Sequence, residues 1–322
     1  MHILLVKTSS LGDVIHNLPV VSDIRQHLPS ATIDWCVEEG FADIPKLHSG
    51  VGQVIPVAFR RWRKSLLSQS TWREIGNFRQ QLKAHQYDWV IDTQGLVKSA
   101  LITWMAKGKR AGYSADAARE PMAARAYDAQ FFVPKTLHAI ERNRRLAAAT
   151  LGYSITPELN YGISASYFSA DWLPVDLPYV VLLTATSRDD KLWPEDHWIR
   201  LGQQLQQAGL LAILPGGSDR ELMRAQRIAA AIPNAIAAPR LNIAELAGLL
   251  AGAQAVVGVD TGLSHLAAAL GKTTIALYTA TDPGLTGVLG GVGNGRFRNL
   301  GGKDTVPTVD NVIQTGQALG AW

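Results

Sequence analysis

The first residues, His2-Ile3-Leu4-Leu5-Val6-Lys7-Thr8-Ser9-Ser10-Leu11-Gly12-Asp13-Val14, contain a strand, a tight loop and the start of a helix. The short apolar run at residues 3–6 is typical of a buried strand. Small residues and a glycine then let the backbone turn tightly, and they bring Asp13 to the start of the helix. A unit of this kind is the building block of a parallel sheet with helical crossovers.

The same alternation of strand and helix continues along both halves of the chain. Residues 152–178 are irregular and rich in proline, so we expect the hinge between two domains there. We therefore predict an α/β protein of two Rossmann-like, doubly wound domains, residues 1–160 and residues 161–322. The predicted strands are 3–6, 33–37, 89–91, 179–184, 210–214, 255–259 and 274–278, and the predicted helices are 72–85, 138–151, 195–207, 220–231, 243–251, 264–270 and 309–319.

The carboxy-terminal end has a less regular pattern. Residues 284–302 are dense in glycine, which predicts a loop. The helix expected at 309–319 can pack either on its own domain or back on the N-terminal domain.

Composition and charge limit the class of protein. The chain has 322 residues, of which 47% are apolar and 18% charged, as in globular proteins. The single cysteine, Cys36, excludes an internal disulfide and suits a reducing cytoplasm. Residues 1–7 lack the pattern of a signal peptide, and the most apolar stretch, residues 246–259, is shorter than the roughly 20 residues that span a bilayer. We expect a cytoplasmic protein without a membrane span.

Several familiar catalytic motifs are incomplete. Gly271-Lys272-Thr273-Thr274 imitates the end of a phosphate loop, but Leu266 stands where the first glycine belongs. No dinucleotide fingerprint follows a predicted strand, and Gly262-Leu263-Ser264-His265-Leu266 lacks the final glycine of a nucleophile elbow. Hydride transfer, phosphate-loop ATP hydrolysis and serine esterase chemistry therefore lose support.

Open parallel sheets bind ligands at the carboxyl ends of their strands, so the loops after the strands are the candidate sites. Asp13 follows the first strand and either caps its helix or acts as a general base. Its place on the first loop of the first sheet, with a second domain expected opposite, favours the general base.

A loop of the second half suits a diphosphate. Thr186, Ser187 and Lys191 follow a predicted strand, and a lysine with neighbouring hydroxyls can hold phosphate oxygens. A solvated polar loop explains this segment alone equally well.

Two further loops of the second half add candidate ligands. Asp260-Thr261-Gly262-Leu263-Ser264-His265 opens a helix whose N-terminus attracts anions, while Asp260 itself would accept hydrogen bonds from sugar hydroxyls. Glu221, in Gly216-Gly217-Ser218-Asp219-Arg220-Glu221, either binds ribose hydroxyls or complements its own helix dipole.

Cations gather in the first half. Arg60-Arg61-Trp62-Arg63-Lys64 places four of them in five residues, which requires open water or an anionic partner. Lys98 and Arg119, on other loops of the same half, favour the anionic partner.

Five motifs together resemble the lipopolysaccharide heptosyltransferases of Gram-negative bacteria, glycosyltransferase family 9. The resemblance extends from residue 1 to about residue 290, and the basic run makes it strongest to members that add the first heptose of the inner core. The motifs are Lys7-Thr8-Ser9-Ser10-Leu11-Gly12-Asp13, Asp92-Thr93-Gln94-Gly95-Leu96-Val97-Lys98-Ser99, Ser187-Arg188-Asp189-Asp190-Lys191, Asp260-Thr261-Gly262-Leu263-Ser264-His265 and Thr281-Asp282-Pro283-Gly284.

The resemblance implies a GT-B fold, in which two Rossmann-like domains face each other across a cleft. It implies ADP-L-glycero-β-D-manno-heptose as donor, Kdo2-lipid A as acceptor, and a peripheral position on the anionic cytoplasmic face of the inner membrane, with no nucleic-acid partner. By matching position, Asp13 is the general base; we expect Lys191 to be catalytic as well, by stabilising the charge that grows on the departing diphosphate. The implied donor contacts are Thr186, Ser187, Lys191, Glu221, Asp260, Thr261, Gly262 and His265, and the implied acceptor contacts are Arg60, Arg61, Arg63, Lys64, Lys98 and Arg119.

The expected reaction is an inverting displacement in which Asp13 takes a proton from the acceptor hydroxyl and ADP leaves from the opposite face. We expect it to need no cofactor or metal, because Asp189 and Asp190 are adjacent and do not form an Asp-x-Asp pair. A nucleotide-sugar epimerase of the same fold and a non-catalytic nucleotide-sugar binding protein are the alternatives.

Overall fold

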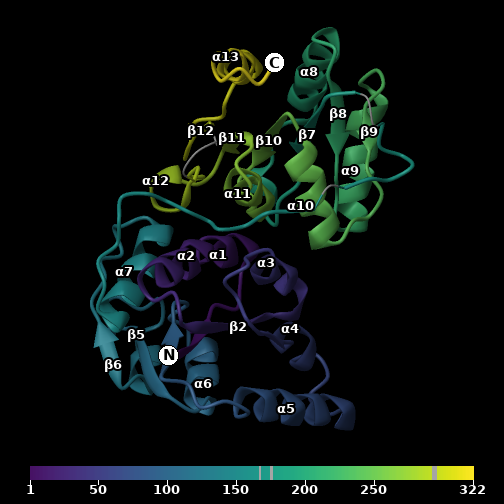
Figure 1. Ribbon diagram of the computed structural model, residues 1–322. Helices are drawn as coiled ribbons and strands as arrows, with labels where there is room; N and C mark the ends of the chain where they lie inside the picture. The colour runs from purple at the N-terminus through teal and green to yellow at the C-terminus, as the bar shows by residue number, and fades with distance from the viewer. Residues whose placement is uncertain (167, 175–176, 292–295) are drawn as a thin grey trace. The chain divides into compact units, whose positions relative to one another are not determined.

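The chain forms two compact units, Met1–Ile163 and Ser164–Trp322, in the computed structural model (Figure 1). The structure describes residues 1–166, 168–174, 177–291 and 296–322. Each unit contains a six-stranded sheet in which every neighbouring strand pair is parallel. The predicted α/β fold with two doubly wound sheets is confirmed.

The N-terminal unit has the strand order β3-β2-β1-β4-β5-β6. Its first strand is buried on both faces, since the side chains at residues 3–6 are fully covered, as expected for the centre of a parallel sheet. Helices α4, α5 and α6 cover one face, where Trp62, Phe78 and Ile102 join the strand side chains in one core. The strands are β1 (His2–Val6), β2 (Thr32–Glu38), β3 (Val54–Val57), β4 (Trp89–Asp92), β5 (Lys109–Tyr113) and β6 (Ala129–Phe131); the helices are α1 (Leu11–Ile15), α2 (Leu18–His27), α3 (Asp43–Lys46), α4 (Phe59–Trp62), α5 (Gln69–Leu82), α6 (Val97–Met105) and α7 (Ala139–Leu151), with 3₁₀ turns at Glu39–Phe41 and Pro121–Ala126.

The C-terminal unit has the strand order β12-β11-β10-β7-β8-β9. Read from the β9 edge, this is the same order as in the N-terminal unit. Its core includes Trp193 and Trp198, whose rings meet edge to face with centroids 4.9 Å apart. The strands are β7 (Tyr179–Leu183), β8 (Leu211–Leu214), β9 (Ile236–Ala237), β10 (Ala255–Val259), β11 (Thr273–Tyr278) and β12 (Phe297–Gly301); the helices are α8 (Glu195–Gln207), α9 (Asp219–Ala230), α10 (Ile243–Gly252), α11 (Gly262–Ala269), α12 (Pro283–Thr286) and α13 (Val309–Ala318), with a 3₁₀ turn at Asp189–Lys191.

The prediction of a loop at residues 284–302 is wrong in part. The segment contains the end of α12 and the edge strand β12, which pairs with β11 so that Ile275 lies beside Arg298. The glycine density hid this strand because its pairing comes from a neighbouring strand and not from its own composition. Residues 292–295 of the predicted loop lie outside the described residues.

The last helix, α13, packs against α8 of its own unit. Val309 and Val312 are buried there in the core that contains Trp198. In the described part of the chain, no helix combines the length and apolar character needed to cross a bilayer.

Candidate active site

The candidate loops of the N-terminal unit flank the point where its strand order reverses. This point lies between β1 and β4, and doubly wound sheets bind ligands at such places. Val6 and Asp92, the last residues of the two strands, are paired in register. The loops carrying Asp13 and Lys98 therefore leave the sheet at the same edge.

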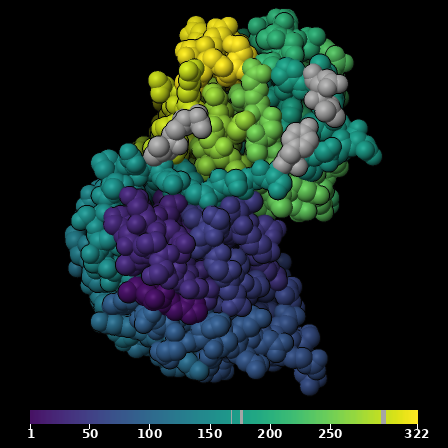
Figure 2. Space-filling model, viewed as in Figure 1, coloured from purple at the N-terminus to yellow at the C-terminus, as the bar shows by residue number. Residues whose placement is uncertain are grey.

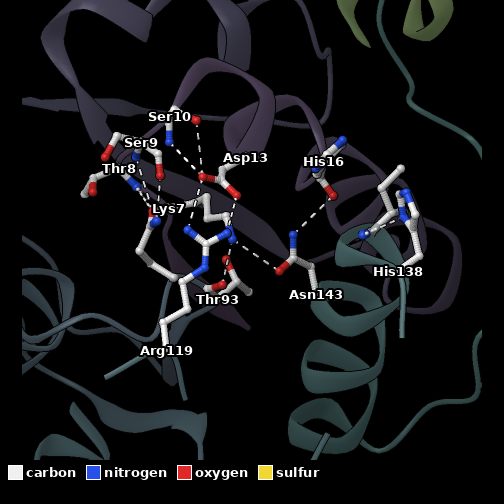
Figure 3. Close-up of polar contacts among 12 residues, drawn as sticks. Lys7, Thr8, Ser9, Ser10, Asp13, His16, Thr93, Arg119, His138 and Asn143 are labelled. Atoms are coloured by element: carbon white, nitrogen blue, oxygen red, sulfur yellow. Dashed lines mark hydrogen bonds and ion pairs between the residues drawn. The ribbon is translucent and has the colours of Figure 1, made fainter. Parts of the chain in front are cut away.

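Asp13 is held by its own loop and by an arginine from a distant one (Figure 3). Its Oδ2 accepts a hydrogen bond from the Ser10 backbone N–H at 2.9 Å, as in a capping box. Arg119 donates to both carboxylate oxygens, with Nη2 2.6 Å from Oδ1 and Nη1 3.3 Å from Oδ2. Asp13 therefore caps its helix and is at the same time part of a polar site.

The charges around Asp13 determine its ionisation. Burial alone would raise the pKa of this carboxyl, but the charges of Lys7 and Arg119 and the hydrogen bonds from Arg119 and Ser10 hold its pKa below the ordinary value for aspartate. Asp13 is thus ionised at neutral pH, as a general base must be. Its basicity is reduced while Arg119 is bound to it.

Lys7 is a site residue to which the sequence analysis gave no role. Its side chain is buried, and its Nζ donates to the Thr93 carbonyl at 2.7 Å and to Asn143 Oδ1 at 3.3 Å. The Tyr113 hydroxyl donates to the same Asn143 oxygen at 3.1 Å. Burial lowers the pKa of Lys7 to about 8. The signal in the sequence was a lysine directly after a buried apolar strand, where a charge needs specific partners.

The two loops at this edge are joined by Gln94. Its side-chain oxygen accepts from the backbone N–H groups of Thr8 at 3.0 Å and Ser9 at 3.2 Å, and its Nε2 donates to the Ser9 carbonyl at 2.6 Å. Lys98, a predicted acceptor contact, donates from Nζ to Ser9 Oγ at 2.9 Å. These bonds fix the backbone that presents Asp13.

The basic run starts at the same edge of the sheet. The Arg60 backbone N–H donates to Glu38 Oε1 at 2.9 Å, and the Glu38 N–H donates to the Thr8 carbonyl at 3.1 Å. The start of α4 is therefore tied to the loop that carries Asp13.

The cations of the basic run differ in their availability. Arg61 is bound by two carboxylates, Glu39 at 3.0 Å and Glu74 at 2.7 Å. Arg63 and Lys64 are exposed, and no carboxylate of the described residues forms an ion pair with them. Among these predicted acceptor contacts, Arg60, Arg63 and Lys64 have charge to offer an anion, whereas the charge of Arg61 is already neutralised.

In the C-terminal unit, two predicted donor contacts bind each other. Lys191 Nζ lies 2.6 Å from Asp260 Oδ2, and the two side chains are 17% and 14% exposed. The Thr281 hydroxyl donates to the same oxygen at 2.7 Å, and the Thr186 hydroxyl donates to the Asp260 carbonyl at 2.9 Å. The loops of Lys191 and Asp260 follow β7 and β10, the strands between which this sheet reverses its order. A ligand that binds Lys191 must share it with Asp260.

A cavity of about 400 Å³ lies beside the same loop. It brings together the predicted residues Thr186, Ser187 and Glu221 with three arginines that the sequence analysis did not select. Arg220, Arg224 and Arg227 recur along α9 with the spacing of one helix face, and this pattern was the signal that could have found them. The lining consists of Ala185, Thr186, Ser187, Asp189, Leu192, Glu195, Ser218, Arg220, Glu221, Arg224 and Arg227.

Glu221 serves the start of its own helix. Its Oε2 accepts from the N–H groups of Gly217 at 2.8 Å and Ser218 at 2.9 Å, which completes a capping box with the Ser218 hydroxyl. A donor contact by Glu221 remains a prediction.

Helix α11 begins at Gly262, after Thr261 as N-cap. A helix start of this kind presents backbone N–H groups and a positive dipole end. His265, one turn further, is buried.

The neighbouring acids Asp189 and Asp190 bind different arginines. Asp189 pairs with Arg220 at 2.9 Å, and Asp190 pairs with Arg188. Within the described residues, no three His, Cys, Asp or Glu side chains gather in a way that could hold a metal ion. Metal independence remains a prediction.

Two Rossmann-like units with polar loops at both switch points define a two-domain α/β protein with a candidate ligand-binding edge in each unit. The model of glycosyltransferase family 9 (heptosyltransferase) matches residues 75–299. Lipopolysaccharide heptosyltransferase 1 of Salmonella typhimurium is 47% identical over 291 residues, which cover 90% of this chain and 92% of that protein. The chain therefore belongs to glycosyltransferase family 9, the heptosyltransferases.

Solved structures agree with this assignment. The structure of E. coli heptosyltransferase WaaC with ADP matches with a TM-score of 0.90 and 43% identity, over 99% of this chain and 100% of that one. WaaC with ADP-2-deoxy-2-fluoro heptose matches with a TM-score of 0.86 and 42% identity, over 99% of both chains. The predicted GT-B fold and the predicted activity, heptose transfer by a glycosyltransferase, are confirmed. The epimerase and the non-catalytic binding protein are not favoured.

Proposed function

We propose that this chain transfers L-glycero-D-manno-heptose from ADP-heptose to a Kdo residue of Kdo2-lipid A, in the assembly of the lipopolysaccharide inner core. The ionised carboxylate of Asp13, held at the switch point of the first sheet, carries the proposal. The donor assignment is supported by the related WaaC structures with ADP and a fluorinated ADP-heptose.

In the proposed reaction, Asp13 accepts the proton of a Kdo hydroxyl as its oxygen forms a bond to the anomeric carbon of the heptose. The bond from that carbon to the ADP oxygen breaks, and ADP leaves with the electron pair, so the configuration inverts. Charge that develops on the diphosphate is stabilised by Lys191, by the hydroxyls of Thr186 and Ser187, and by the start of α11. The reaction as written needs no metal or cofactor.

Arg119 links acceptor binding to the activation of Asp13. Its guanidinium donates to both oxygens of the carboxylate, and it is 43% exposed, so an incoming anion can reach it. A Kdo carboxylate offers the same bidentate geometry. When the acceptor binds Arg119, Asp13 loses hydrogen bonds that lower its pKa and becomes a stronger base.

The location that we propose is peripheral, on the cytoplasmic face of the inner membrane. The exposed cations Arg63 and Lys64 support it, because anionic lipids attract each nearby cation by about 1 kcal/mol. Phosphates and Kdo carboxylates of the acceptor would be attracted in the same way.

Asp13→Asn tests the proposed base. The amide oxygen can still accept from the Ser10 N–H, so the start of α1 is kept and the variant should fold. We expect normal ADP-heptose affinity by calorimetry, a normal melting temperature, and a transfer rate at least about 100-fold lower, the range for a lost general base. Transfer at the wild-type rate would remove Asp13 from the mechanism. Release or isomerisation of the sugar by the wild type without acceptor would instead indicate an epimerase.

A further inference from the structure

The segment between α4 and α5 presents large apolar side chains to water. Leu67 is fully exposed, Leu66 is 52% exposed and Trp72 is 60% exposed. We call these three residues the apolar tip. The segment lies at an outlying corner of the N-terminal unit, at the lower right of Figures 1 and 2.

The apolar tip is held in shape by its own contacts. The Trp72 indole N–H donates to the Leu66 carbonyl at 2.8 Å, and the Ser68 N–H donates to the Ser65 carbonyl at 3.0 Å. These bonds close the turn and fix the tryptophan against it. The exposure of the leucines is therefore built into the segment and does not need a rearrangement.

The base of the segment is anchored in the core. Trp62 is buried, donates from Nε1 to Glu74 Oε2 at 2.8 Å, and packs against Phe78 with ring centroids 5.7 Å apart. Helices α4 and α5 are therefore fixed to each other and to the core, and the turn between them places the two leucines in water.

The charge around the apolar tip is almost entirely positive. Residues 59–79 contain six basic side chains and one acid, Glu74, which is occupied by Arg61 and Trp62. Arg63 and Lys64 immediately precede the tip and are exposed. Exposed leucines and a tryptophan next to unpaired cations are the composition of a surface that sits in the headgroup region of an anionic bilayer.

We infer that the apolar tip inserts into the anionic leaflet that contains the lipid acceptor, with Arg63 and Lys64 on the lipid headgroups. The position of the tip supports this occupant. Arg60, the second residue of α4, is tied through Glu38 to the loop of Asp13, and the segment that carries the tip continues from the end of this helix. The tip therefore follows in the chain from a helix that is hydrogen-bonded to the loops of the candidate acceptor site. The inference rests on the proposed lipid acceptor.

A second exposed apolar face in the same unit provides the matched control. Leu101 and Trp104 on α6 are 48% and 62% exposed, similar to Leu66 and Trp72. Substitutions on the tip and on this face separate their contributions.

The test measures partition of the full chain onto vesicles of phosphatidylcholine and phosphatidylglycerol by flotation. We expect Leu66→Gln/Leu67→Gln to lower the partition coefficient about tenfold or more at all salt concentrations. The two leucines contribute by burying apolar surface, which salt does not screen. Leu101→Gln should leave it unchanged. Arg63→Gln/Lys64→Gln should lower it at low salt and much less at high salt.

Fluorescence provides an independent readout. Brominated phosphatidylcholine should quench tryptophan emission of the wild type, Trp72→Phe should remove most of this quenching, and Trp104→Phe should not. The inference would be overturned if Trp104→Phe lost the quenching and Trp72→Phe kept it. It would also be overturned if the double-leucine variant bound vesicles with the wild-type partition coefficient. A wild-type dimer that the double-leucine variant converts to a monomer would also overturn it, since a second copy would then cover the tip.

Activity separates this inference from the proposed function. The double-leucine variant should transfer heptose to a deacylated, water-soluble Kdo acceptor at the wild-type rate, and lose activity only on acceptor in vesicles. If the wild type itself does not use the soluble acceptor, the proposed function fails whatever the vesicle result.

Discussion

Replacing Lys191 with methionine removes one charge from the candidate donor site and exposes another. The ammonium lies 2.6 Å from Asp260 Oδ2, and both side chains are less than one-fifth exposed. The pair is neutral as a whole. After Lys191→Met, Asp260 keeps its charge and is left with the Thr281 hydroxyl as its side-chain partner. A diphosphate then meets an uncompensated carboxylate where it formerly met a shared cation.

The magnitude follows from Coulomb's law. Two unit charges 4 Å apart interact by about 4 kcal/mol at an effective dielectric of 20, and partial exposure reduces this to about 2 kcal/mol. That is about a 30-fold loss of ADP affinity. Lys191 also supplies a preorganised charge that stabilises the leaving diphosphate. Its loss raises the barrier to transfer by a further 2–4 kcal/mol, which lowers the rate about 30- to 1,000-fold.

Calorimetry with ADP and steady-state transfer kinetics measure the two effects separately. The double variant Lys191→Met/Asp260→Asn is the control: we expect it to recover most of the ADP affinity, since the exposed carboxylate is gone, but not the rate, since the cation is still missing. Melting temperatures of the three variants show whether the fold is intact. Wild-type ADP affinity and turnover within about twofold of normal in Lys191→Met would refute the reasoning.

Three further predictions concern other contacts. Arg119→Gln should raise the pKa of Asp13, so the acid limb of the pH profile of kcat/KM should move to higher pH; an unmoved limb would separate Arg119 from the base. Transfer should continue at the same rate in EDTA, and a loss that magnesium restores would show that a metal holds the diphosphate. Asp23→Ala should lower the free energy of unfolding by about 3–5 kcal/mol in urea melts, because it leaves the buried guanidinium of Arg144, now bound at 2.7 and 2.8 Å, without its charge partner; a loss below about 1 kcal/mol would contradict this.

The fold was predictable from the sequence where strands are apolar and central. The first strand and β10 are continuous apolar runs, and each has a polar loop directly after it. The apolar run and the loop together predict a strand. The edge strands, and β5 beside the edge strand β6, were missed. Strand β5 begins with Lys109 and Arg110, and β9 has only two residues, so neither has an apolar pattern of its own.

The candidate site was predictable in position but not in its pairings. The rule that ligands bind after parallel strands selects Asp13, Lys191 and Asp260 from sequence alone. It does not reveal that Arg119, 106 residues away along the chain, binds Asp13. Pairings between loops depend on which loops the sheet order makes neighbours, and a single sequence contains no local signal for them.

These pairings imply a common principle for the two units. In each, the charge expected to act on substrate is neutralised by an opposite charge from another loop: Asp13 by Arg119, and Lys191 by Asp260. Neutral pairs lower the cost of keeping charges in a partly buried site before substrate arrives. Both proposed substrates are anionic, so each competes for the cation of its pair. Acceptor carboxylates that bind Arg119 release Asp13 as a base, and a diphosphate that binds Lys191 frees the Asp260 carboxylate to accept hydrogen bonds from a sugar. Substrate binding would then generate the reactive charges, which explains why the ionised base can have a low pKa in the unliganded chain and still accept a proton during transfer.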